Sequence, residues 1–389
     1  MHFNNTKGDD SMFINFWYAA ALGSEVTADK PKKVKMLGQN FVLFRDTKGV
    51  ARCVSDICVH RGASLSVGKI KGDAVECPYH GWKFDGTGAC TMIPSLGVSG
   101  KPPARAKVDG YPTQEKYGLV FAFLGDLPEN ERPPLMEVPE WGREGWRCIN
   151  LEYKWEANFE RSMEAGLDPA HAEFVHTGMK FAGTDEEYVM PDRFDVKRDK
   201  WGTFLQIQLR TVPLPSRPEL GNANISSVKP QAQVVTAASS FYGANCTITR
   251  LKFSERDEVC QYMWETPEDE FHVAKHLVSV RTIVTDPMFD ESFNKRNMFV
   301  ADEDKRVVEY IDPMVYPSTL TKEVFVPADA QIAAFRDYLK DWENLGWRID
   351  SRRVEADQGR IGYCIPSPER RTTGNWAIDP VPLVGATKS

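Results

Sequence analysis

Cys58-Val59-His60 and, after a gap of 16 residues, Cys77-Pro78-Tyr79-His80 are the two motifs from which the fold of this chain follows. Each motif supplies one cysteine and one histidine, and thiolate and imidazole are the groups that bind soft and borderline transition metals. Two such motifs at this spacing predict a four-ligand metal site held on two loops.

Two kinds of site use this ligand set. One is a tetrahedral zinc site with two Cys and two His, in which like ligands usually stand together as C-x₂₋₄-C and H-x₃₋₅-H. The other is a Rieske [2Fe–2S] centre, in which two Cys hold one iron and two His hold the other. Here each motif pairs one Cys with one His, so that each loop reaches both irons. The sequence therefore favours the Rieske centre over zinc.

Composition restricts the class of protein further. The chain has 389 residues, enough for two or three cores, and a formal net charge of −7, which argues against nucleic acid and anionic membranes as partners. It contains no apolar run of 18 residues and begins without a hydrophobic stretch of signal-peptide type. Of the eight cysteines, the six outside the two motifs are interpreted as reduced, packed thiols, which suits a reducing compartment. We therefore expect a cytoplasmic protein that does not span a membrane.

The pattern of apolar and polar residues changes near residue 135. Short alternating apolar segments separated by Gly turns predict β-hairpins up to residue 124, and a Pro-rich, charged linker follows. The later part predicts helices at 150–180, 300–315 and 327–345, with strands over 190–290. We predict an α+β protein with a β-rich metal-cluster domain over 12–135 and, over 136–389, a catalytic domain with an antiparallel sheet flanked by helices. The tail after Pro366 either wraps another subunit or is mobile.

A second metal motif lies in the later part, at Asp168-Pro169-Ala170-His171-Ala172-Glu173-Phe174-Val175-His176. Two His and one carboxylate on one face of an iron leave the opposite face open for dioxygen and substrate. On a regular helix, residues five apart are separated by about 140°, so that both rings can grip one ion. The competing pair His272 and His276 stands among charges, and we interpret it as solvated or packing histidine.

The third ligand is expected to be a distant carboxylate. On a helix Asp304 shares a face with Val307, Val308 and Ile311, whereas Glu303 falls mainly on another face. A carboxylate on an apolar stripe is costly unless it is paired or bound to a metal. Asp304 is therefore the predicted third ligand, and the alternative is a helix cap or a surface acid.

Together these motifs resemble one family. The segments CVHRGA at 58–63 and CPYHGW at 77–82 are similar to the cluster motif of the Rieske non-haem iron oxygenases. The resemblance implies that the cluster ligands are Cys58, His60, Cys77 and His80, and that a mononuclear Fe(II) is bound by His171, His176 and Asp304. It also implies that Asp168 is required for catalysis, as the bridge between His80 of one subunit and an iron-bound His of the next. The sequence departs from the family at Ala165, where members often carry Asn.

The resemblance implies a terminal oxygenase that works as a homotrimer. Electrons from NAD(P)H would arrive through a ferredoxin, a flavin reductase or both. The expected reaction uses O₂ to hydroxylate or oxidatively dealkylate an aromatic or polycyclic small molecule, as in the branch of the vanillate and dicamba demethylases. The alternatives are a ring cis-dihydroxylating or angular dioxygenase and, more distantly, a Rieske electron carrier without oxygenase activity.

Overall fold

The computed structural model describes residues 12–176, 194–211, 233–317 and 320–385. These residues form two compact units. The N-terminal unit contains residues 12–135, 266–270 and 342–385, and the central unit contains the described residues of 136–265 and 271–341. The predicted second domain, 136–389, therefore differs from the central unit at its C-terminal end, because residues 342–385 pack with the N-terminal unit.

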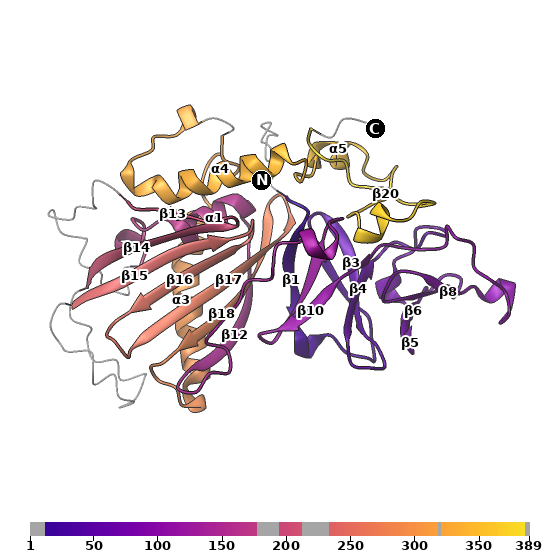
Figure 1. The fold of residues 1–389 in the computed structure, drawn as a ribbon, viewed down its shortest axis with the longest axis horizontal. Helices are drawn as coiled ribbons and strands as arrows, with labels where there is room; N and C mark the ends of the chain where they lie inside the picture. Colours follow the sequence, from indigo (N-terminus) through magenta and orange to yellow (C-terminus); the bar gives the residue numbers. More distant parts are fainter. Residues whose placement is uncertain (1–11, 177–193, 212–232, 318–319, 386–389) are drawn as a thin grey trace. The chain divides into compact units, whose positions relative to one another are not determined.

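The N-terminal unit is built from small sheets (Figure 1). One sheet has the order β1-β11-β10, with Phe16–Leu22, Leu119–Leu124 and Thr113–Lys116. A second has the order β2-β3-β4-β9, with Lys32–Met36, Gln39–Arg45, Ala51–Ser55 and Gly110–Tyr111. A third has the order β5-β6-β7-β8, with Lys69–Lys71, Ala74–Glu76, Lys83–Asp85 and Cys90–Met92. The strands within each of these sheets pair antiparallel, as the hairpin pattern predicts.

The end of the chain packs on this N-terminal unit. There β19 (Tyr363–Cys364) and β20 (Asp379–Pro380) pair parallel, and the Tyr111 hydroxyl donates to the carbonyl of Ile365 at 2.6 Å. Asp109, 1% exposed, accepts from Arg370 Nε at 2.7 Å and from the Ser367 N–H at 2.9 Å. In the described residues the tail is thus held by its own subunit, through a buried carboxylate.

Because of this buried ion pair, we expect alanine substitutions of two adjacent arginines to reduce the stability of the protein by unequal amounts. Arg370→Ala leaves Asp109 buried without its counter-charge, which should cost about 3–5 kcal/mol of stability. Arg371→Ala removes only the exposed pair with Asp126, whose N–O distance is 3.0 Å, and should cost about 0–1 kcal/mol. The measurements are the thermal unfolding midpoint and the rate of proteolysis within 361–385. Equal behaviour of the two variants would contradict this account of the tail.

The central unit is organised around a seven-stranded sheet with the order β12-β18-β17-β16-β15-β14-β13. Strand β12 pairs antiparallel with β18. Each strand from β13 to β17 also pairs antiparallel with the next one in the chain. In this order the strands are β12 (Arg147–Trp155), β18 (His272–Arg281), β17 (Glu258–Asp269), β16 (Cys246–Lys252), β15 (Gln233–Tyr242), β14 (Gly202–Thr211) and β13 (Lys197–Arg198). The last residues of β17, from Thr266, belong to the N-terminal unit.

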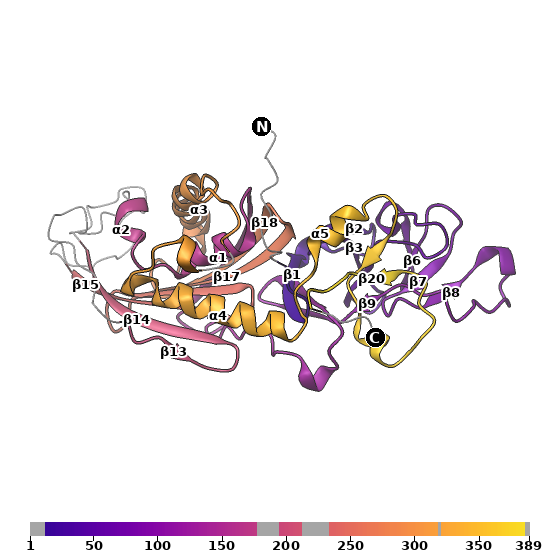
Figure 2. The ribbon, with the colours of Figure 1, turned by 90° about the horizontal axis from the view of Figure 1, so that it is seen from above.

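Helices accompany this sheet. Figure 2 shows α1 (Phe159–Leu167), α2 (Ala172–Val175) and α3 (Asp290–Val308) on the same side of it. Helix α4 (Ala330–Asn344) contacts β15 through Phe335, whose ring centroid lies 5.1 Å from that of Phe241. A further helix, α5 (Ser351–Ala356), belongs to the N-terminal unit. The predicted α+β class is confirmed.

Two predicted helices begin in the wrong place. The helix expected over 300–315 is α3, which spans Asp290–Val308. Residues 150–155, expected to be helical, belong to β12, and α1 starts only at Phe159. Apolar or aromatic side chains occupy alternate positions, at Ile149, Leu151, Tyr153 and Trp155, which is the period of a strand. Pairing with β18 decides the conformation.

Among the helices in the described part of the chain, none is both long and apolar enough to cross a bilayer.

Candidate metal centres

The two Cys/His motifs form loops of the same geometry. In each loop the Cys N–H donates to the carbonyl five residues later, and the Gly four residues after the Cys donates back to the Cys carbonyl. The pairs are Cys58 with Ala63 at 2.9 Å, Gly62 with Cys58 at 2.8 Å, Cys77 with Trp82 at 2.8 Å and Gly81 with Cys77 at 3.1 Å. The two glycines have φ of 73° and 70°, a left-handed conformation that disfavours other residues. The glycines therefore allow both loops to turn back behind their ligands.

The side chains of these loops converge. Cys58 and Cys77 are 1% and 2% exposed and belong to one hydrophobic cluster. The rings of His60 and His80 lie 4.5 Å apart between centroids, and His60 stacks on Trp82 with 5° between their planes. Nδ1 of His60 is buried and has no hydrogen-bond partner among the described residues. A buried nitrogen without a partner, beside two buried thiols, fits a metal cluster.

The surroundings of this site favour the neutral forms of the Cys58 thiol and the His60 imidazole. Burial raises the pKa of the Cys58 thiol to about 12, and the neighbouring Cys77 contributes to the rise. Burial also lowers the pKa of His60. Metal ligation requires thiolate and neutral imidazole, so cluster binding must release the thiol protons while the histidine is already in its ligating form.

The second motif is shaped by the Asp168-Pro169 step. Asn158 caps the start of α1 by accepting from the Glu160 N–H at 3.0 Å. Asp168 ends α1 in an extended conformation, with φ −77° and ψ 116°, because the residue before a proline is disfavoured in a helix. The chain then restarts as the single turn α2, with His171 before it and His176 after it. The break turns both histidines toward one point.

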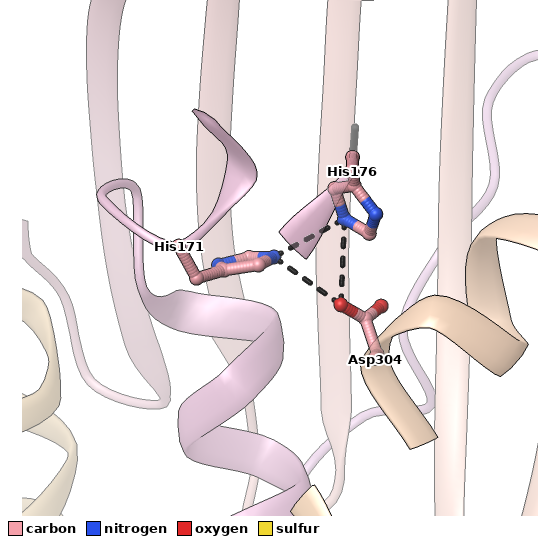
Figure 3. A group of neighbouring side chains, drawn as sticks. All are labelled: His171, His176 and Asp304. Carbon is pink, nitrogen blue, oxygen red and sulfur yellow. Dashed lines mark hydrogen bonds and ion pairs between the residues drawn. The ribbon is translucent and has the colours of Figure 1, made fainter. Parts of the chain in front are cut away.

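Asp304 on α3 completes this arrangement (Figure 3). Nε2 of His171 lies 3.3 Å from Nε2 of His176, and Oδ1 of Asp304 lies 3.5 Å and 3.4 Å from these two nitrogens. A point equidistant from the corners of such a triangle is about 2.0 Å from each (the mean side divided by √3), close to typical metal–nitrogen and metal–oxygen bonds. The three side chains fit one metal ion.

Burial affects two of these groups in opposite directions. It raises the pKa of Asp304, an effect opposed by His176, His171 and Lys275, and it lowers the pKa of His176. The neutral imidazole is ready to bind a metal, whereas the carboxylate is held in an unfavourable environment that a cation would relieve. The site is therefore electrostatically suited to a divalent cation.

Asp168 contacts His171 through its main chain and not through its carboxylate. Its backbone carbonyl, and not its carboxylate, lies 2.6 Å from Nδ1 of His171. The carboxylate accepts from the Ala170 N–H through Oδ1 at 2.7 Å, and Oδ2 has no hydrogen bond to any described residue. Within its own subunit, Asp168 thus orients His171 through the main chain and leaves one carboxylate oxygen available.

Three further residues complete the comparison with the sequence. Glu303, placed on another helix face by the sequence, is 4% exposed, and its Oε2 lies 3.3 Å from Nδ1 of His176. The signal that would have found it is its position next to Asp304. His276 is 2% exposed and lies 3.6 Å from Glu152, while His272 is exposed, so this pair does not join the triad.

Comparisons with known proteins identify both domains of the chain. Residues 16–111 match the model of the Rieske [2Fe–2S] domain, and residues 155–345 match that of the vanillate O-demethylase oxygenase C-terminal domain. The methylxanthine N1-demethylase NdmA of Pseudomonas putida is 27% identical over 84% of this chain and 88% of its own. Dicamba monooxygenase bound to 3,6-dichlorosalicylic acid has a TM-score of 0.72 at 22% identity, over 86% of this chain and 98% of its own.

Other similarities are shorter. Chlorophyllide a oxygenase of Chlamydomonas reinhardtii is 39% identical over 42% of this chain and 24% of its own length. For this protein and several further curated relatives, the chain spans less than half of their length. The two matched domains, together with the fold, show that the chain belongs to the Rieske non-haem iron oxygenases, whose cofactors are a [2Fe–2S] cluster and a mononuclear iron.

Proposed function

We propose that this protein is a terminal oxygenase that hydroxylates or oxidatively dealkylates an aromatic or polycyclic small molecule. The observation that carries this proposal is the presence in one chain of two Cys/His loops and of the convergent His171, His176 and Asp304. A Rieske electron carrier needs the loops but not the triad. The balanced reaction is R–H + O₂ + 2e⁻ + 2H⁺ → R–OH + H₂O, and for an N- or O-methyl substrate the hydroxylated methyl leaves as formaldehyde.

The chain contributes ligands, orientation and an apolar surface. Cys58, Cys77, His60 and His80 are the proposed cluster ligands, and His171, His176 and Asp304 are the proposed iron ligands. When bound, the iron supplies the activation of dioxygen. Ala172, next to His171, packs against Ala237, as do Ile207 and Leu251, so this part of the sheet carries apolar side chains. Such a wall suits an aromatic substrate.

The branch within the family is supported by the activities for which relatives are named. The methylxanthine N1-demethylase NdmA, aligned over 84% of this chain, favours dealkylation or hydroxylation, and dicamba monooxygenase shares the fold. The second candidate is ring dioxygenation, since the phenoxybenzoate dioxygenase alpha subunit of Ectopseudomonas oleovorans is 34% identical over 43% of this chain.

The proposed assembly is a homotrimer in the cytoplasm. Asp168 Oδ2, without a hydrogen bond to the described residues of its own chain, is the group we assign to His80 of the neighbouring subunit. A head-to-tail contact of this kind generates a ring when the rotation between subunits closes, and the family resemblance implies three subunits. The electron donor is a ferredoxin, a flavin reductase or both, using NAD(P)H. The cytoplasmic location is supported by the six cysteines outside the cluster loops, which form no disulfide and which the cytosol would keep reduced.

The test is product analysis under ¹⁸O₂ with the protein reduced by a ferredoxin and reductase. Methoxy-, N-methyl- and polycyclic aromatic compounds are supplied, and formaldehyde is measured in parallel. One labelled oxygen in the product, or one methyl lost as one formaldehyde, supports the proposal. Two labelled oxygens with two added hydrogens indicate dioxygenation. Reversible cluster reduction without oxygen consumption on any substrate indicates an electron carrier.

A further inference from the structure

A buried acid stands behind one of the proposed iron ligands. Glu303 is 4% exposed on α3, and acids are rarely buried without a specific reason. Its Oε2 lies 3.3 Å from Nδ1 of His176, on the ring edge opposite the triad. We propose that Glu303 is a positioning residue that fixes the orientation and tautomer of His176. This inference rests on the proposed iron triad.

Helix α3 holds His176 from both edges of its ring. Oδ1 of Asp304 lies 3.4 Å from Nε2, while Oε2 of Glu303 lies 3.3 Å from Nδ1 of the same imidazole. The two acids are consecutive residues of a 19-residue helix, so the helix backbone sets the positions from which both carboxylates reach the ring. One rigid element therefore supplies an iron ligand and the partner of a second ligand.

The contact also decides which nitrogen is free to bind the metal. A neutral imidazole carries hydrogen on one nitrogen and a lone pair on the other. A carboxylate at Nδ1 can only accept, so Nδ1 carries the hydrogen and donates it to Glu303. Nε2 is left with its lone pair directed at His171 Nε2 and Asp304 Oδ1. Metal-bound histidines generally donate their other ring N–H to such a partner.

The two iron ligands thus differ in their partners. Nδ1 of His171 faces the neutral backbone carbonyl of Asp168 at 2.6 Å, whereas Nδ1 of His176 faces a carboxylate. An anionic acceptor raises the basicity of the ligating nitrogen more than a neutral one. His176 is therefore the stronger electron donor of the pair, and the difference depends on the charge of Glu303.

The experiment measures metal binding and not turnover. The mononuclear metal is removed by chelation with the cluster left intact, and Fe(II) and Co(II) affinities are determined by titration. Glu303→Ala should weaken Fe(II) binding about 10–100-fold, and Glu303→Gln, which keeps an acceptor oxygen but loses the charge, should fall between this variant and wild type. The EPR spectrum of bound Co(II), recorded with the oxidised and EPR-silent cluster, should change in both variants.

The matched control is Asp302→Asn, which removes the same charge from an exposed position on the same helix and should leave affinity and spectrum unchanged. Wild-type affinity and Co(II) spectrum in Glu303→Gln and Glu303→Ala would overturn the inference while leaving the triad intact. If Glu303→Ala does not fold, the isosteric Glu303→Gln decides alone. Failure of the triad itself has a different signature, because His176→Ala would then bind Fe(II) as wild type does.

Discussion

Alanine in place of Asp304 should yield a protein with its [2Fe–2S] absorption intact, with no mononuclear iron and with no product. The carboxylate supplies one of three proposed ligand atoms, all within 4.8 Å of one another, and two histidines alone hold a divalent ion weakly. Burial raises the pKa of this carboxyl, which means that the folded protein stabilises the charged carboxylate less well than water does. Its removal should therefore not destabilise the protein without metal.

The measurement is iron content by elemental analysis, with cluster absorption as an internal check on the N-terminal unit. Asp302→Ala is the control, because Asp302 is an exposed acid two residues earlier on α3. Iron content should fall by one per chain in Asp304→Ala and stay unchanged in Asp302→Ala. Full iron retention in Asp304→Ala would show that another residue supplies the third ligand.

Asp168→Asn should keep both metal centres filled and slow turnover about 100-fold, at the upper end of typical effects for residues that support metal ligands. The backbone carbonyl of residue 168 still faces His171, so the triad geometry remains. What the variant loses is the charge at Oδ2, which we assign to His80 of the neighbouring subunit. The effect should appear in transfer of electrons from the cluster, and not in iron content or in substrate affinity.

Single-turnover experiments with a pre-reduced cluster test this prediction. Cluster reoxidation in the presence of substrate and O₂ should slow about as much as product formation. Sedimentation measures the assembly in parallel, because a loss of the trimer would explain a slow rate differently. Normal turnover with normal iron content would exclude Asp168 as a bridge, and full activity of a monomer would exclude a bridge between subunits.

The sequence by itself determined the features that depend on short-range spacing. Each cluster loop has its Cys, His and turn-forming Gly within five residues, so the two motifs specify the loops almost without reference to the rest of the chain. The same holds for His171 and His176, where Asp168-Pro169 ends one helix and the next turn brings both rings together. Strand alternation likewise predicted most of the seven-stranded sheet.

Tertiary structure decided what depends on residues far apart. Residues 147–155 form a strand because β18 pairs with them, although the helical expectation covered 150–155. Asp304 was predicted from an inward apolar stripe, yet Val307 in that stripe is 49% exposed, and Glu303 is more deeply buried than the sequence suggested. The tail joins the N-terminal unit because Asp109, 261 positions from Arg370, is buried and needs a cation. Burial and long-range pairing arise only when the chain folds, and they assign partners that local spacing cannot specify.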